Sequence, residues 1–273
     1  MADESDEQPN SDDLMTAGDV DLRPGRNSDP QDEIDKYISE DIRKFYDVYS
    51  YGHAATILAT SFPDELADLK ESLLNFRITK REIGMPGGNE SDMPKKFSHT
   101  LRPRGWVEAR IQGDLTVRMQ EYGEEILEGG KTKKFKVKDQ EARYIENFID
   151  GHKIDYVKGR VAFDLEWNSK DQTFDRDLYA MRVFHECGLL SLGVMVTRSE
   201  KLNPVFDVVP KLNKDGEVVT SGGAPVMSKG KYGASTTWMG KLLYRLNAGR
   251  HGGCPILVFG ITPELIEDWN QNA

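Results

Sequence analysis

Residues 160–197 contain a strand, a helix and a second strand in direct succession, and this order constrains the fold more than any other feature. The run RVAFDLEW (residues 160–167) has the composition of a buried strand. The next segment predicts a helix that Asp175 caps and that ends at Cys187. The run LLSLGVMVT (residues 189–197) is continuously apolar, which is typical of a strand buried on both faces. A strand–helix–strand unit joins parallel strands, so the sequence predicts an α/β protein whose sheet is at least partly parallel.

The rest of the chain supplies further helices and strands around this unit. Low apolar content indicates that residues 1–32 are a disordered acidic tail, and residues 33–273 fit a single domain. Periodicity and capping signals predict helices over residues 35–58, 63–76, 95–102 and 139–149, and another from Ser235 or Thr236 to Leu246. Strands are predicted over residues 105–111, 133–139, 153–157 and 254–261. The predicted architecture is a mixed central sheet flanked by helices.

The charge of the chain is unevenly distributed. Residues 1–33 hold 11 acidic and 2 basic side chains, whereas the remaining residues hold 35 acidic and 34 basic ones. No acidic residue occurs between Glu217 and Glu264, although this span contains five lysines and arginines, and the segment KTKKFKVK (residues 131–138) adds five lysines. Solvated basic faces would explain either segment. Charge segregated in this way is also what a surface that binds phosphates needs.

Composition excludes several classes of protein. No apolar run approaches the roughly 20 residues that a membrane helix needs, and the acidic N-terminus lacks the pattern of a signal peptide. The two cysteines, Cys187 and Cys254, have neither a disulfide framework nor metal-ligand spacing. We therefore expect a soluble, cytoplasmic protein.

Three carboxylates stand out within the strands. Asp164 and Glu166 lie two residues apart in VAFDLEW, so both project from one face of the strand. Asp155 lies nine residues earlier, and a tight hairpin would bring it close to Asp164. Burying adjacent carboxylates without a partner costs several kcal/mol, so a cation or a shared proton must lie between them. Such a cluster suits Mg²⁺, although ion pairs with Lys158, Lys170 or Arg176 would also neutralise it.

The pattern Asp155, then Asp164, then Glu166 resembles the catalytic motif of PD-(D/E)XK nucleases. Glu166 occupies the place of the usual lysine, a variation that resembles restriction enzymes of the BamHI and BglII type. The stretches FDLEWNSKDQTFDRDLYAMRVFHECG, VMVTR, KYGASTT and GGCPILVFGIT are similar to the BglII/BstYI family of type II restriction endonucleases. The likeness covers residues 93–265, which would form the catalytic core after a helical N-terminal part over residues 33–92.

This resemblance implies roles for individual residues. Asp155, Asp164 and the backbone carbonyl of Leu165 would bind Mg²⁺, and Glu166 would orient or deprotonate the attacking water. Because a carboxylate does not stabilise developing negative charge as a lysine does, the identity of the base stays open. A fourth acidic or amide group is common in the family, and the candidates for it are Gln140, Glu141 and Glu146.

Other residues are candidates for binding DNA. Asn168, Ser169 and Lys170 directly follow the catalytic strand, where family members contact DNA, although a turn that ends the strand is an equal alternative. Charge and family position suggest further contacts from Lys229, Lys231, Ser235, Thr236, Thr237 and Arg250. Asp175, Arg176 and Asp177 are expected to stabilise the start of the following helix. Trp106, Trp167 and Trp238 are expected in the core, and we assign no chemistry to His152, His185 or His251.

The predicted function is Mg²⁺-dependent cleavage of a short palindrome in double-stranded DNA by a homodimer, with residues 35–76 contributing to the dimer interface. The resemblance suggests a six-base site centred on GATC and is compatible with a companion DNA methyltransferase. A DNA-binding protein without cleavage activity is one alternative. FDLEW also resembles the catalytic strand of chitinase-like glycoside hydrolases, but these need a (β/α)₈ barrel, and the sequence contains only one convincing crossover unit.

Overall fold

The computed structural model describes residues 25, 27–87, 92–139, 141–151, 153–233 and 235–269. The chain divides into two compact units. The first runs to Ala109 and resumes at Ile154, and the second consists of Arg110–Lys153. All three predicted catalytic carboxylates belong to the first unit. The assignment of residues 33–273 to one domain stays a prediction.

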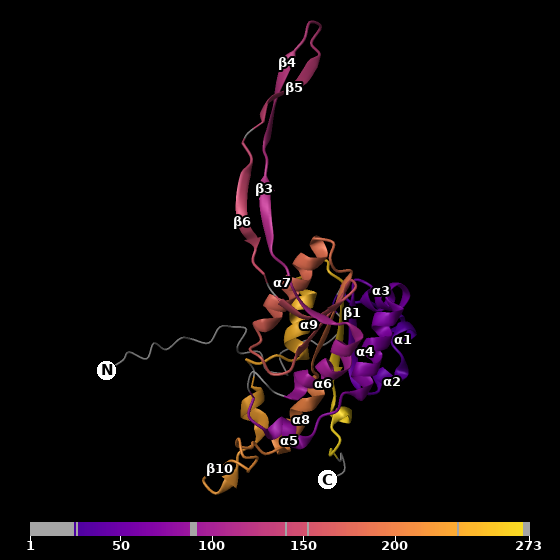
Figure 1. Cartoon of the computed structure of the whole chain (residues 1–273), viewed down its shortest axis with the longest axis vertical. Coiled ribbons are helices and arrows are strands. Elements are labelled where there is room, and N and C mark those ends of the chain that lie inside the picture. Colours follow the sequence, from indigo (N-terminus) through magenta and orange to yellow (C-terminus); the bar gives the residue numbers. More distant parts are fainter. Residues whose placement is uncertain are drawn as a thin grey trace, which may run out of the picture. The chain divides into compact units, whose positions relative to one another are not determined.

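A six-stranded mixed sheet forms the centre of the first unit, in the order β1-β12-β9-β8-β7-β2. Figure 1 labels its edge strand β1 together with the helices of this unit. β8, β9 and β12 are parallel, whereas β1 and β7 are antiparallel to their neighbours β12 and β8. The three parallel strands are buried along their whole length, as expected for strands covered on both faces. The sheet confirms the predicted α/β class. Its strands are β1 (Tyr46–Tyr51), β2 (Val107–Arg110), β7 (Lys153–Lys158), β8 (Val161–Glu166), β9 (Leu192–Arg198) and β12 (Ile256–Ile261).

Different helices cover the two faces of this sheet. Phe163 and Leu165 of β8 belong to one apolar cluster with the N-terminal helices α1 (Gln31–Tyr37), α3 (Ala54–Ser61), α4 (Pro63–Asn75) and α6 (Asp92–Leu101). On the other face, α7 (Thr173–Glu186) contacts β8, β9 and α9 (Met239–Asn247). The approach of α7 is so close that a Cβ atom at Gly193 of β9 would lie 2.4 Å from the sulfur of Met181. Because side chains alternate along β8, Asp164 and Glu166 face α7.

The other elements of the first unit are short. They are α2 (Glu40–Arg43), α5 (Lys80–Gly84) and α8 (Asn203–Val208), the 3₁₀ helices η3 (Arg102–Arg104), η4 (Glu200–Leu202), η5 (Ser228–Tyr232) and η6 (Pro263–Leu265), and the paired strands β10 (Thr220–Ser221) and β11 (Ala224–Pro225). Within the described residues, none of the helices is both long and apolar enough to cross a lipid bilayer.

The second unit consists of antiparallel ribbons. β3 (Gly113–Val117) pairs with β6 (Arg143–Ile149), and β4 (Gln120–Ile126) pairs with β5 (Thr132–Asp139). The basic segment KTKKFKVK lies largely on β5, and the strand opposite is acidic. Lys134 forms an ion pair with Glu124 at 3.6 Å, and Lys133 is in register with Glu125. Folding therefore places this basic segment against acidic neighbours instead of leaving a surface of one sign.

Two predicted helices are wrong. The helix expected over residues 35–58 is interrupted by β1, whose sequence YDVYSY alternates between buried and half-buried positions until its buried last two residues, and which pairs with β12. Its apolar residues fit both a helical and a strand period, and pairing with the sheet decides between them. The helix expected over residues 139–149 is strand β6, because pairing with β3 satisfies its backbone.

Both predicted N-caps are also wrong. α7 begins at Thr173, so Asp175 lies in its first turn instead of capping it. α9 begins at Met239 after Trp238, and neither Ser235 nor Thr236 caps it. The hydroxyl of Thr236 instead donates to the Gly233 carbonyl and accepts a hydrogen bond from Arg198. The carboxylate of Asp175 pairs instead with Arg245 and Arg250.

The folded part of the chain begins earlier than the predicted end of the acidic tail. Ser28 forms a bridge with Tyr51, and the side chain of Asp29 accepts hydrogen bonds from the His53 backbone and the Ser50 hydroxyl. Asp29 is buried, and α1 begins at Gln31. Residues 28–32 are therefore part of the fold.

Candidate catalytic and metal site

The β7–β8 hairpin places Asp155 beside Asp164. Gly159 has φ +54, the left-handed conformation that a tight two-residue turn requires, and the register pairs Tyr156 with Phe163. One further step along this register sets Asp155 opposite Asp164, with both side chains on the same face. The backbone N–H of Asp155 donates to Oδ1 of Asp164 at 2.8 Å. Asp164 is buried, whereas Asp155 is exposed at the edge of the site.

Glu166 lies two residues further along β8 on the same face. It is buried, and its side chain forms a hydrogen bond with Ser169. Its backbone is fixed on the β9 side, because the hydroxyl of Thr197 donates to the Glu166 carbonyl at 2.8 Å. The sheet therefore holds Asp164 and Glu166 side by side beneath α7, as the alternation of the strand predicts.

α7 contributes a fourth carboxylate, Asp177, which the sequence interpretation assigned only to stabilising the helix start. Asp177 is 3% exposed and lies on the buried face of α7 with Phe174 and Leu178. The Arg176 guanidinium donates to its Oδ1 from Nε and Nη2, at 3.1 and 3.0 Å. The signal in the sequence was an acidic residue at a helical position whose neighbours at i−3 and i+1 are apolar.

The carboxylates of the site repel one another. Burial raises the pKa of Asp164 well above its usual range, and the charges of Asp177 and Asp155 raise it further. Burial, reinforced by the charge of Asp177, raises the pKa of Glu166 to about 8. Burial also raises the pKa of Asp177, despite the opposing effect of Arg176. Binding of protons or of a cation therefore stabilises these carboxylates.

Three buried oxygens in this group lack hydrogen-bond partners among the residues that the structure describes. They are Oδ2 of Asp164, Oε2 of Glu166 and Oδ2 of Asp177. A buried carboxylate oxygen without a donor costs free energy unless another group satisfies it. Carboxylate oxygens are the ligands that Mg²⁺ prefers, so these residues fit a divalent cation.

The ion pairs considered as an alternative for Asp164 and Glu166 form elsewhere. Lys158 pairs with Asp68 of α4 at 2.6 Å, and Arg176 pairs with Asp177. Lys170 is exposed beyond the end of β8. Of these three cations, only Arg176 contributes charge near the site, where it lowers the pKa of Glu166 less than burial raises it.

A comparison with protein families decides the class of the chain. The family model described as restriction endonuclease BglII/BglIII matches residues 46–261.

The chain belongs to the BglII/BglIII restriction endonuclease family. The match begins at the first residue of β1 and ends at the last residue of β12, so it spans the whole sheet and all three predicted carboxylates. None of the curated proteins compared with the chain matches it. As a member of this family, the protein is a type II restriction endonuclease, a hydrolase that binds DNA.

The other residues considered for the endonuclease site stay predictions. Glu146 is exposed on strand β6, Glu141 is also exposed, and Gln140 lies outside the described residues. Leu165 packs its side chain into the opposite apolar cluster, so its predicted part in metal binding concerns only its backbone carbonyl.

The three tryptophans considered above lie in the core. Trp106, Trp167 and Trp238 are buried, as predicted. The rings of His185 and His251 bond to the backbone carbonyls of Leu190 and Cys254, and His152 lies outside the described residues.

The predicted DNA contacts next to β8 are partly used by the fold. The amide of Asn168 donates to the Lys231 carbonyl at 3.3 Å. The backbone of Ser169 and that of Thr237 are joined by a hydrogen bond of 2.8 Å, and Thr237 is buried. Ser235 and Lys170 are exposed. Their roles in DNA binding stay predictions.

The basic C-terminal span is largely neutralised by acidic residues from other segments. Lys229 pairs with Asp207 at 2.8 Å, and Arg250 pairs with Asp175 at 2.6 Å. Lys241 and Arg245 are buried and both pair with Asp171. The ammonium of Lys231 donates to the backbone carbonyls of Ile83 and Met85 at the end of α5. A run without acidic residues in the sequence therefore does not give a surface of unpaired positive charge.

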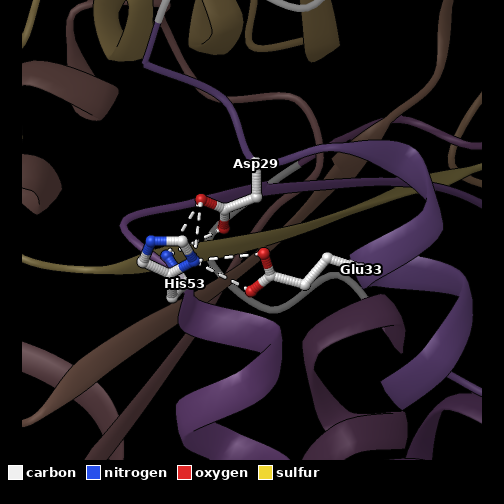
Figure 2. A group of neighbouring side chains, drawn as sticks. All are labelled: Asp29, Glu33 and His53. Atoms are coloured by element: carbon white, nitrogen blue, oxygen red, sulfur yellow. Dashed lines mark hydrogen bonds and ion pairs between the residues drawn. The ribbon is translucent and has the colours of Figure 1, made fainter.

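Among the described residues, the group whose ligand atoms have the spacing of a metal site is a different one, formed by Asp29, Glu33 and His53 (Figure 2). One ligand atom from each residue lies within 4.8 Å of the others. Their oxygens nevertheless have donors. The backbone N–H of His53 lies 3.0 and 2.8 Å from the two oxygens of Asp29, and the His53 ring contacts Glu33 at 2.9 Å. The hydroxyl of Ser50 donates to Asp29, and that of Thr56 donates to Glu33.

Proposed function

We propose that this endonuclease hydrolyses phosphodiester bonds of a short palindrome in double-stranded DNA and that its activity depends on Mg²⁺. The observation that carries the proposal is the group of buried carboxylate oxygens without donors at the β7–β8 hairpin, in a chain of this family. Asp155 and Asp164, with the Leu165 carbonyl, would hold the cation. When bound, Mg²⁺ supplies positive charge that polarises the scissile phosphate and acidifies water.

Glu166 would act on the attacking water. In the absence of a cation its pKa of about 8 leaves it mostly protonated at neutral pH, and a protonated carboxyl cannot accept a proton. A cation held by Asp155 and Asp164 would favour the ionised form of Glu166, which is the form that can accept a proton. Glu166 would orient the water for in-line attack on phosphorus and accept its proton, while the bond between phosphorus and the 3′ oxygen breaks and that oxygen takes a proton from solvent. The products are a 5′-phosphate and a 3′-hydroxyl.

A palindromic substrate implies a two-fold symmetric homodimer, in which each protomer cuts one strand. Part of residues 35–76 would contribute to the dimer interface. The recognition site is proposed to have six bases centred on GATC, and a companion methyltransferase that protects this site fits a restriction–modification system. We place the enzyme in the cytoplasm, where such substrates occur.

The test is digestion of DNA that contains every six-base palindrome with a GATC centre, followed by sequencing of the ends. Cleavage at one such palindrome with Mg²⁺, and none with chelator or with the Asp164→Ala variant, is expected. Site-specific binding without cleavage under any divalent cation would instead identify a DNA-binding protein that lacks nuclease activity. Cuts at unrelated sequences would contradict the proposed recognition site alone.

A further inference from the structure

Asp177 is in an environment that a helix-stabilising residue does not need. It belongs to the buried face of α7 and is 3% exposed, at the place where α7 contacts β8. Its carboxyl is within hydrogen-bonding distance of the carboxyl of Glu166, so a shared proton can join the two in the absence of a cation. Two buried carboxyls in contact repel each other unless a proton or a cation lies between them. An apolar residue here would avoid this cost and would continue the apolar face of the helix.

The pairing with Arg176 satisfies only half of the Asp177 carboxylate. Both guanidinium nitrogens donate to Oδ1, while Oδ2 has no donor among the described residues. The side chain of Arg176 is 57% exposed, so the pair neutralises Asp177 from the solvent side. The free oxygen remains inside, with the free oxygens of Asp164 and Glu166.

We propose that Asp177 is a further ligand of the divalent cation. Asp155, Asp164 and Glu166 reach the cation from the sheet, and Asp177 reaches it from α7. The proposal rests on the proposed metal site and adds a ligand from a different element. Arg176 holds the Asp177 carboxylate in one orientation through Oδ1 and leaves Oδ2 for the cation. With a ligand from the helix, the cation links α7 to β8.

The experiment measures Mn²⁺ binding by the intact, DNA-free enzyme, using the electron paramagnetic resonance signal of free Mn²⁺. Asp177→Asn keeps the shape of the side chain and an acceptor for Arg176 but removes the charge. We expect it to weaken Mn²⁺ binding at least tenfold. In chelator, we expect its melting temperature to rise, because a buried repulsive charge is gone. Glu186→Gln, an exposed position of α7 that pairs only with Arg182 in the described structure, is the control and should change neither quantity.

Asp177 is only the partner of Arg176 if two results are obtained together. The Mn²⁺ affinity of Asp177→Asn would be within twofold of the parental affinity, and its melting temperature in chelator would be lower. If the asparagine variant does not fold, the same titration with Asp177→Ala decides between these outcomes. Asp164→Asn separates the two proposals. If it too leaves Mn²⁺ binding unchanged, the proposed metal site itself is wrong, whereas loss of binding in Asp164→Asn alone rejects only the role of Asp177.

Discussion

Two groups of acidic side chains in this endonuclease differ in spacing and in surroundings, and among the described residues the close spacing of a metal site belongs to Asp29, Glu33 and His53. Around Asp29 and Glu33, backbone and hydroxyl donors reach the carboxylate oxygens, and the His53 ring lies against Glu33. Around Asp164 and Glu166, one buried oxygen of each carboxylate has no donor among the described residues. The first group satisfies itself and joins the start of the fold to α3. The second group needs protons or a cation to neutralise it, which is the better indication of a metal site.

The difference also appears in the pKa values. Hydrogen bonds from Thr56 and His53 lower the pKa of Glu33, and the bond to Glu33 raises the pKa of His53, so this pair favours its ionised forms. Burial and mutual repulsion raise the pKa of Asp164 and Glu166, which favours their protonated forms. Among the described residues, the spacing of ligand atoms favours the first group as a metal site, whereas buried oxygens without donors favour the second.

The largest expected effect is on cleavage. Asp164→Ala or Asp155→Ala should reduce Mg²⁺-dependent cleavage more than about a thousandfold, which corresponds to ~4 kcal/mol in the activation barrier. DNA binding should persist or tighten, because each substitution removes a negative charge facing the phosphate. Rates are measured on a plasmid with one cognate site. Glu33→Gln is the matched control and should cut at the parental rate. The assignment of the two acidic groups would be reversed if Glu33→Gln lost activity while Asp164→Ala kept it.

A smaller effect is expected on stability from the first group. Asp29→Asn weakens the bonds to the His53 backbone and the Ser50 hydroxyl, and we expect the free energy of unfolding to fall by about 1–3 kcal/mol. Urea denaturation measures this change, while specific activity should be retained. Deletion of residues 1–24, which leaves Asp29 in place, is the control and should change neither. A stabilisation by Mg²⁺ that disappears in Asp29→Asn would show that this group binds metal after all.

Much of the fold, and the placement of Asp155 beside Asp164, could be predicted because local patterns agreed with the tertiary structure. β8, α7 and β9 have clear periodicity, and a two-residue turn with Gly159 fixes the register that brings Asp155 to Asp164. β1 was missed because YDVYSY acquires its conformation from pairing with β12, which is about 200 residues away. Such a partner leaves no trace in a local window.

Asp177 and the charge of the basic span were misjudged for a related reason. Asp177 lies beside Asp175 and Arg176 in the sequence, where charged residues usually stabilise a helix start, and only the packing of α7 against β8 reveals its burial. The acid-free span acquires its counterions from elsewhere in the fold, as Lys229 does from Asp207. The net charge of a segment therefore does not predict the charge that its surface presents.

The two groups should also differ in how pH affects the stability of the metal-free enzyme. The pKa of Glu166 is 4.5 in the unfolded chain and about 8 in the folded protein. The free energy of unfolding therefore falls as pH rises through this window. The pKa of His53 is raised above 6.5, so its contribution is complete below 6.5 and is lost as pH rises through the folded value.

Urea denaturation in chelator, from pH 4.5 to 8.5, separates these effects. Glu166→Gln should flatten the decline over the whole window, whereas His53→Gln should alter it only above about 6.5. A pH profile that Glu166→Gln leaves unchanged would mean that Glu166 is already ionised and neutralised in the folded protein.

The smallest expected effect extends the same reasoning from acidic to basic side chains. The Nζ of Lys229 lies 2.8 Å from Oδ1 of Asp207, whereas Lys170 forms no ion pair among the described residues. A lysine already paired in the free protein must give up its partner to neutralise a phosphate, so it releases fewer counterions on binding DNA. Lys170→Ala should therefore reduce the slope of log K against log salt by about 0.9, and Lys229→Ala by less than half as much. Fluorescence anisotropy on a scrambled duplex at several salt concentrations measures both slopes. Equal reductions would show that DNA displaces Asp207 from Lys229 at little cost, and that pairing within the fold does not predict which lysines bind phosphate.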